Sequence, residues 1–179
     1  MQSPGASSFD FPVVPGAGDR VAYLGLGANL GDREGALRAA IRLLVDRNAL
    51  FDSRVSSFFE TDAVSEFPQP HYLNAVIRGQ TRLDPRQLLA VCLDVESLLG
   101  RQRPVGVQKA ARTIDIDVLL VADVVLNEAD LVIPHPQLLN RSFVRIPLAE
   151  VAASGLVHPI TRESLDVAAP DAAVRRWST

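Results

Sequence analysis

The sequence predicts an α+β fold, in which an antiparallel sheet carries two helices on one of its faces. The first observation behind this prediction is the order of the expected elements, which is strand, helix, strand, strand, helix, strand over residues 20–121. The second is that each helix has a capping residue and a helical apolar period, whereas the strands are runs of β-forming residues. This order is that of a ferredoxin-like split βαβ unit, so we expect a ferredoxin-like βαββαβ core with an open opposite face and a C-terminal extension.

The chain is long enough to bury a core of its own, and its composition excludes the disordered and fibrous classes. It has 179 residues, of which 47% are hydrophobic. No apolar run has the length of a membrane span and the N-terminus lacks a signal-peptide pattern, so we expect a cytoplasmic protein without a membrane partner. The net charge of −3 gives no reason to expect nucleic acid as a partner. We expect a monomer, in which the single cysteine, Cys92, is a buried apolar residue of a helix.

The N-terminal part divides into a leader and the first strand and helix. Residues 1–19 are rich in Pro, Gly and Ser, so we expect a flexible leader before a single domain of residues 20–179. Residues 21–27 form an apolar run that predicts a buried strand, and Asp32 is placed to cap the helix that follows. The glycines of this segment almost match a dinucleotide-binding fingerprint, but the last interval is one residue too long, which disfavours a Rossmann fold.

Two further strands and a second helix follow. Residues 51–61 and 72–81 are rich in alternating β-formers and predict two strands. The connection between them, residues 62–71, contains two prolines and is too long for a hairpin turn; loops of this kind are often functional. The second helix begins after Asp84, which opens a capping box, and ends at Gly100.

The next strand carries two carboxylates. Asp115 and Asp117 alternate with apolar residues, so both point to the same face of the strand. Like charges side by side destabilise a sheet, and Mg²⁺ removes the problem because it binds hard oxygen ligands together with substrate phosphates. Residues 101–112 hold four cations and no acid: Arg101, Arg103, Lys109 and Arg112. A metal site beside cations that can bind phosphate indicates phosphoryl transfer, whereas the alternative is a solvated Asp pair beside an ordinary basic loop.

The C-terminal part is less regular. Residues 122–128 predict another hairpin, and the Pro-His-Pro sequence at 134–136 interrupts the chain before a short helix near Gln137–Asn140. The tail from residue 161 is polar, and we expect at most a marginal helix there.

Over residues 21–151, the chain resembles the 6-hydroxymethyl-7,8-dihydropterin pyrophosphokinases of the folate pathway. Single motifs of this kind are weak evidence, but here they occur in the order of the family and at nearly its spacing. They are Gly27-Ala28-Asn29-Leu30-Gly31-Asp32, Ser56-Ser57-Phe58 with Thr61, Tyr72-Leu73-Asn74-Ala75, Glu96 with Gly100-Arg101 and Arg103, Arg112-Thr113-Ile114-Asp115-Ile116-Asp117, Pro134-His135, Asn140-Arg141 with Phe143, and Pro147-Leu148.

The resemblance implies transfer of the β,γ-pyrophosphoryl unit of ATP to the hydroxymethyl oxygen of the pterin, with release of AMP. It also implies two Mg²⁺ ions held by Asp115 and Asp117. The phosphates are expected beside the basic residues Arg101, Arg103, Arg112, His135 and Arg141, of which the first three are the expected catalytic residues. The pterin is expected beside Thr61, Val64, Tyr72, Asn74 and Phe143. These types suit a pterin, because an amide pairs with its amide edge and an aromatic ring stacks on its face.

The chain also departs from the resembling enzymes. The cationic loop ends in Lys-Ala-Ala-Arg at residues 109–112 instead of the usual Trp-Gly-Pro-Arg, and Asp62 stands where a proline often follows the threonine. Asp130 and Val132 occupy positions where some members contact ATP. We expect Glu96 on the helix surface, and His135 is either a phosphate ligand or a surface residue. These departures leave open an alternative function, a ferredoxin-like nucleotide- or pterin-binding module or a weakened paralogue without efficient turnover.

Overall fold

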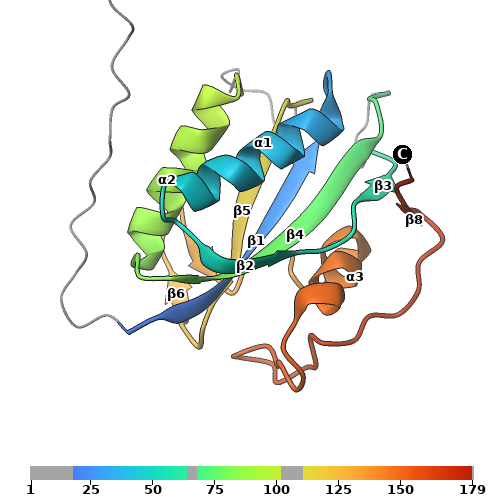
Figure 1. Cartoon of the computed structure of the whole chain (residues 1–179). Coiled ribbons are helices and arrows are strands. Elements are labelled where there is room, and N and C mark those ends of the chain that lie inside the picture. The colour runs from blue at the N-terminus through green and yellow to red at the C-terminus, as the bar shows by residue number, and fades with distance from the viewer. Residues whose placement is uncertain (1–17, 64–67, 102–110, 179) are drawn as a thin grey trace, which may run out of the picture.

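The fold is built on one main antiparallel sheet. A computed structural model describes residues 18–63, 68–101 and 111–178. No helix in these ranges is long and apolar enough to cross a membrane. Most of the predicted leader, together with Val64, Arg103 and Lys109, lies outside them. The elements, shown in Figure 1, are β1 (Arg20–Ala28), α1 (Arg33–Asp46), β2 (Phe51–Val55), β3 (Phe59–Thr61), β4 (Tyr72–Thr81), α2 (Pro85–Leu98), β5 (Asp115–Val121), β6 (Leu126–Asn127), β7 (Val132–Ile133), α3 (Ser142–Val151) and β8 (Val174–Arg176).

The main sheet has β1 near its centre. The strand order is β5-β1-β4-β3-β8, with β2 also paired to β4, and every pair is antiparallel. The predicted α+β class with an antiparallel sheet is therefore confirmed. Because β1 lies between β4 and β5, residues far apart in the sequence become direct neighbours across it.

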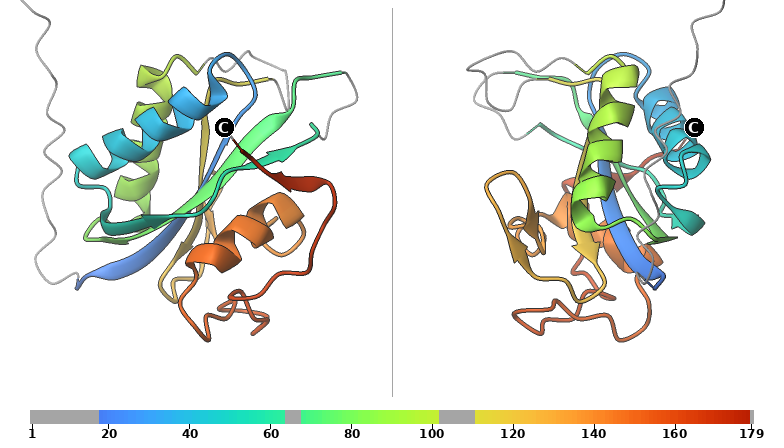
Figure 2. Two further views of the ribbon diagram at one scale, coloured as in Figure 1. Left: turned by 45° about the vertical axis from the view of Figure 1, so that its right-hand side comes forward. Right: turned by 90° about the vertical axis from the view of Figure 1, so that its left-hand side faces the viewer.

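Helices α1 and α2 cover one face of the sheet (Figure 2). Both begin as predicted: Asp32 accepts a hydrogen bond from the backbone N–H of Gly35 at 2.9 Å, and Asp84 forms a capping box with Gln87. Their apolar sides meet the apolar residues of the strands in the larger hydrophobic cluster. Cys92 is fully buried there, as expected, and burial raises the pKa of its thiol.

The opposite face, called the site face below, is partly covered, so the prediction of an open face is wrong for one half of it. Tyr23, Val76 and Leu119 project from three neighbouring strands and form a second apolar cluster. Helix α3 covers this cluster with Val144, Leu148 and Val151. Burial of these large side chains removes apolar surface from water, which is why the face cannot stay bare. The other half of the site face, where β4 and β5 begin, remains accessible.

The predicted strand of residues 51–61 is interrupted. Residues 56–58 leave the strand and separate β2 from β3. Here the hydroxyl of Ser56 accepts a hydrogen bond from the backbone N–H of Val76 at 3.0 Å, and the Ser56 N–H donates to the Val76 carbonyl at 2.9 Å. A side chain thus replaces part of the backbone ladder, a competition that hydroxyl residues often enter.

The C-terminal region also differs from the prediction. Residues 137–140 form turns instead of a helix, and the helix begins one turn later, at Ser142. The hairpin expected at residues 122–128 is a short pairing of β6 with β7, which extends it to Ile133. In its described residues, up to 178, the tail forms no helix but a strand, β8, on the edge of β3. An exposed strand edge has unpaired backbone groups, and a polar tail can form hydrogen bonds with them. The tail has no sequence period that predicts this strand.

Candidate active site

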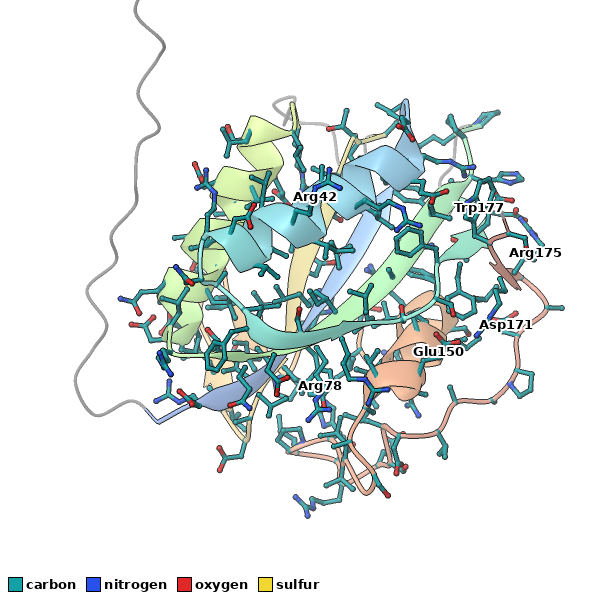
Figure 3. All side chains as sticks on the ribbon, viewed as in Figure 1. Arg42, Arg78, Glu150, Asp171, Arg175 and Trp177 are labelled. Carbon is teal, nitrogen blue, oxygen red and sulfur yellow. The ribbon has the colours of Figure 1, made fainter. Side chains whose placement is uncertain are left out.

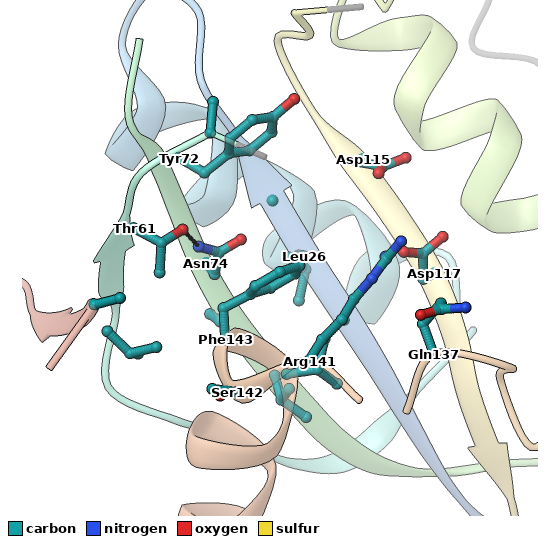
Figure 4. Close-up of a pocket in the computed structure, with 18 of the residues that line it drawn as sticks. Leu26, Thr61, Tyr72, Asn74, Asp115, Asp117, Gln137, Arg141, Ser142 and Phe143 are labelled. Carbon is teal, nitrogen blue, oxygen red and sulfur yellow. Dashed lines mark hydrogen bonds between the residues drawn. The ribbon is translucent and has the colours of Figure 1, made fainter. Parts of the chain in front are cut away.

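A pocket of about 580 Å³ lies on the open half of the site face (Figure 4). Two glycines of β1 form its floor. In the sheet register Gly27 lies between Asn74 of β4 and Asp115 of β5. Gly25 lies between Val76 and Asp117 in the same way. Because glycine has no side chain, the floor is open between the amide on one side and the carboxylates on the other.

The sequence reasoning missed this function of the glycines, although two glycines spaced by two in a strand were a usable signal. A Cβ atom at Gly27 would lie 3.4 Å from the amide oxygen of Asn74. At Gly25 it would lie 3.4 Å from a methyl group of Leu119. A side chain at either position therefore occupies the space above the floor.

Asp115 and Asp117 both line the pocket, as the strand period predicted. The Asp115 carboxylate forms ion pairs with Arg101 and Arg112, one through each oxygen. Asp117 is deeper and makes no hydrogen bond within the described part of the chain. Burial and the neighbouring charge of Asp115 raise the pKa of Asp117 to about 6, although nearby arginines oppose this shift. The negative charge of Asp117 is therefore only partly compensated.

Arg101 is held in place by Glu96, contrary to the prediction that Glu96 lies on the helix surface. The Glu96 side chain is only 2% exposed, because this side of α2 faces β5. Its carboxylate accepts a hydrogen bond from the backbone N–H of Ile116 at 2.7 Å and also contacts the Arg101 guanidinium. Glu96 therefore connects α2, Arg101 and β5, and it fixes Arg101 beside Asp115.

Arg112 is held through its backbone by Asn29, at the end of β1. Asn29 is 1% exposed, and its side-chain oxygen accepts a hydrogen bond from the Arg112 N–H at 2.8 Å. The Asn29 N–H donates in turn to the Arg112 carbonyl at 3.1 Å. The side-chain amide of Asn29 also donates to Gln69 and to the carbonyl of Pro70. Asn29 thus positions Arg112, a predicted phosphate-binding residue. The sequence had suggested no function for the motif of residues 27–32, to which Asn29 belongs.

Arg141 lines the pocket, whereas His135 is not among the lining residues and lies near Arg141 and Asp115. The Nδ1 atom of His135 accepts a hydrogen bond from the backbone N–H of Gln137 at 3.1 Å. Burial and the nearby charge of Arg141 lower the pKa of His135, while Asp115 opposes the shift. The neutral ring then carries its proton on Nε2, where it can donate. Arg141 lines the pocket with its guanidinium 5.6 Å from the centre of the Phe143 ring, and in Figure 4 it points toward Asp117.

On the other side of β1, Asn74 and Thr61 form a polar pair. The Asn74 amide donates to the Thr61 hydroxyl at 3.0 Å, and both residues are only 6% exposed. Asn74 is therefore buried and does not face water on the sheet surface. Its oxygen faces Gly27 and the pocket. The pocket is also lined by Tyr72 and Phe143, so the predicted pterin residues within the described ranges come together, while Val64 lies outside these ranges.

Part of the pocket wall was not predicted. It comes from the turn before α3, from the first residue of α3, and from the C-terminal segment that leads into β8. These residues are Gln137, Asn140, Ser142, Asp171, Ala173 and Val174. Small and polar residues in irregular segments have no period, so only the folded chain brings them to this place.

The carboxylates fit Mg²⁺. Asp115 and Asp117 are neighbouring hard oxygen ligands. Burial and the charge of Asp115 raise the pKa of Asp117, and a bound cation would favour its charged form. Within the described residues, no group of three or more His, Cys, Asp or Glu side chains is arranged to hold an ion by itself. A site of this kind suits a cation that brings further oxygen ligands on a phosphate.

The chain is similar to known proteins of one family. The sequence model of 7,8-dihydro-6-hydroxymethylpterin-pyrophosphokinase (HPPK) matches residues 23–153. A pyrophosphokinase of Bacillus subtilis is 36% identical over 159 residues, which cover 89% of this chain and 91% of that protein. One from Porphyromonas gingivalis is 40% identical over 135 residues, 74% of this chain and 90% of that protein.

Longer proteins match as well. The chain spans 22% of a folic acid synthesis protein of Schizosaccharomyces pombe, with 34% identity over 164 residues. A solved structure of HPPK-DHPS in complex with substrates has a TM-score of 0.63 at 13% identity, and the match covers 83% of this chain and 42% of that one. A Plasmodium falciparum HPPK-DHPS structure, also with a TM-score of 0.63, matches at 16% identity over 86% of this chain and 44% of that one. These structures support the fold, and the sequence matches show that the chain belongs to the HPPK family, the pyrophosphokinases of folate biosynthesis.

Proposed function

We propose that the pocket is the active site in which this pyrophosphokinase transfers the β,γ-pyrophosphoryl unit of ATP to the hydroxymethyl oxygen of 6-hydroxymethyl-7,8-dihydropterin and releases AMP. The observation that carries the proposal is the glycine floor between Asn74 and the carboxylate pair. Neighbouring strands are about 4.8 Å apart, so Asn74 and Asp115 lie roughly 10 Å apart across Gly27. A flat pterin on this floor, with its amide edge at Asn74, directs its hydroxymethyl group toward the carboxylates.

The polar and aromatic residues on the Asn74 side are suited to hold the pterin. The Asn74 side chain is fixed by Thr61, which leaves its oxygen as an acceptor for an N–H group of the ring. Tyr72 and Phe143 offer aromatic faces for stacking. Val64 remains a prediction from the resemblance.

Asp115 and Asp117 are the residues that would hold two Mg²⁺ ions. When bound, Mg²⁺ supplies positive charge that neutralises phosphate oxygens and acidifies the attacking hydroxyl. In the free protein, Arg101 and Arg112 neutralise Asp115 instead. We propose that their N–H groups turn to phosphate oxygens once ATP and its metal ions are present. Their proposed catalytic role is to stabilise the negative charge that develops during transfer.

The remaining phosphate contacts are proposed for His135, Arg141 and Arg103. His135 donates through Nε2 in its neutral form, and the Arg141 guanidinium lies on the carboxylate side of the pocket. Arg103 remains a prediction. Catalysis then rests mainly on position and charge, since the hydroxyl must lie in line with the β-phosphorus.

We also propose that the core is a ferredoxin-like split βαβ unit. The order β5-β1-β4 with β2 and β3 beyond β4, and α1 and α2 on one face, supports this class. A single domain over residues 20–179, a monomeric state and a cytoplasmic location remain predictions from the sequence.

The test is to incubate the full chain with ATP, Mg²⁺ and 6-hydroxymethyl-7,8-dihydropterin and to measure AMP. We expect AMP and the pyrophosphorylated pterin in equal amounts, with no AMP when the pterin is omitted. The Asp115→Asn and Asp117→Asn variants are the matched controls and are expected to be inactive. Release of AMP no faster than in the pterin-free control would overturn the proposal and favour a binding module without turnover.

A further inference from the structure

The C-terminal segment is part of the pocket wall. Asp171, Ala173 and Val174 line the pocket, and β8 pairs with β3 so that Val174 lies opposite Thr61. Asp171 is held by the backbone N–H of Ala173 at 2.9 Å and by the hydroxyl of Ser142. The segment lies beyond residues 23–153, which the family sequence model matches.

Arg175 of this strand contacts both ends of the connection between β3 and β4. Its guanidinium donates to the Asp62 carboxylate at 3.0 Å, which lowers the pKa of Asp62, and lies 3.5 Å from Nδ1 of His71. It also lies 3.8 Å from the Glu60 carboxylate. Asp62 lines the pocket, and His71 immediately precedes Tyr72, which also lines it.

Other contacts anchor the strand independently of Arg175. The indole N–H of Trp177 donates to Glu34 at 3.0 Å, and the Trp177 backbone N–H donates to Phe58 at 2.8 Å. Arg176 forms an ion pair with Glu150. Figure 3 shows Arg175 and Trp177 together at the edge of the sheet. Loss of the Arg175 side chain alone should therefore leave β8 in place.

We infer that Arg175 is a positioning residue for pterin binding: its ion pair with Asp62 fixes the wall of the pocket next to Thr61. This inference rests on the proposed function of the pocket. The Arg175 and Asp62 side chains are 44% and 68% exposed, so their ion pair contributes little to stability and is screened by salt. Its effect on substrate binding can therefore be measured without a large change in folding.

The experiment compares three variants with the wild type. Two are the single variants Arg175→Gln and Asp62→Asn. The third is a double variant with reversed charges, Arg175→Asp together with Asp62→Arg. Steady-state AMP release gives the KM for the pterin and for ATP, and thermal melts report stability. Both single variants should raise the KM for the pterin about threefold to tenfold, leave the KM for ATP within about twofold, and leave Tm nearly unchanged. The reversed pair should restore most of the pterin affinity. Added salt should raise the wild-type KM for the pterin toward the Arg175→Gln value.

Arg176→Gln is the matched control, because it removes an ion pair from the same strand without touching Asp62. It should behave like the wild type. An unchanged pterin KM in Arg175→Gln, with an active wild type, would overturn the inference. An equal rise of the KM values for the pterin and for ATP would overturn it too. The same holds if the double variant with reversed charges does not regain pterin affinity. A wild type that releases no AMP would instead contradict the proposed function.

Discussion

Asp117 is the residue in which the electrostatics of the site are clearest. Its pKa is raised from 3.8 to about 6, so between these pH values the folded protein binds more protons than the unfolded chain. The free energy of unfolding therefore falls as pH rises from about 4 to about 6, and this loss persists above pH 6. Asp115 differs, since two arginines compensate its charge.

We predict that Asp117→Asn stabilises the metal-free protein at pH 7.5 by on the order of 1–2 kcal/mol, because it removes a buried charge beside that of Asp115. Asp115→Asn should destabilise it, because Arg101 and Arg112 each lose an ion pair with Asp115. Urea unfolding in EDTA from pH 4 to 8 measures both, with the exposed Asp123→Asn as control. Equal effects of the two substitutions would contradict the assignment of the charges.

Asn74 provides a second prediction for a single residue. Asn74→Ala should weaken pterin binding by on the order of 1–3 kcal/mol, since a polar edge of the ring is left unpaired, and should leave ATP binding nearly intact. Calorimetric titration of the pterin in the presence of a non-hydrolysable ATP analogue, and of the analogue alone, measures both affinities. A similar loss for the two ligands would show that Asn74 is structural.

Among the elements, β1 has the position that organises the site. It connects Asn74, on the proposed pterin side, to the carboxylate side, and its two glycines keep the floor between them open. Neither Gly25 nor Gly27 has a positive φ, so an alanine is compatible with the backbone at both positions. An alanine would therefore change the space above the floor and not the backbone conformation.

We predict that Gly27→Ala impairs pterin binding while stability holds or rises by about 0.5–1 kcal/mol, the usual difference between Ala and Gly in a strand. A ligand titration beside a thermal melt measures the two effects. Gly79→Ala is the contrast, because its Cβ would lie 3.0 Å from that of Leu50 and 3.2 Å from a backbone oxygen, so stability should fall. Normal pterin affinity in Gly27→Ala would exclude the glycine floor as the binding surface.

In the molecule as a whole, the larger apolar cluster and the pocket lie on opposite faces of the sheet. One face is closed by α1 and α2 over the larger apolar cluster, and the site face is divided between α3 and the pocket. Ligands bound to the site face are thus expected to add to stability without rearranging the core.

We predict that ATP raises Tm strongly only when Mg²⁺ is present, because the carboxylates repel phosphate without it. A ligand at a hundred times its Kd stabilises by about 2.7 kcal/mol. Thermal melts with ATP in Mg²⁺ and in EDTA measure the difference, which Asp115→Asn should greatly reduce. Equal shifts in both conditions would show that ATP binds without the metal site.

The sequence by itself determined two of the helices, several strands of the main sheet and the chemical character of the candidate site. Capping residues and apolar periods located α1 and α2, because these signals are local. The period of two in β5 placed Asp115 and Asp117 on one face, and the motif order identified the family. The sequence also showed that Asp62 departs from the residue usual in the resembling enzymes, but it did not show that Asp62 pairs with Arg175.

The tertiary structure alone decided how the residues are held. Glu96 is buried because α2 packs on β5, and Asn29 reaches Arg112 across a separation of 83 residues. The pairing of Arg175 with Asp62 spans 113 residues. No local period encodes such contacts; they follow from strand order and from the need to cover an exposed strand edge. The sequence therefore predicted which groups belong to the candidate site, whereas the packing of distant segments determined where each of them lies.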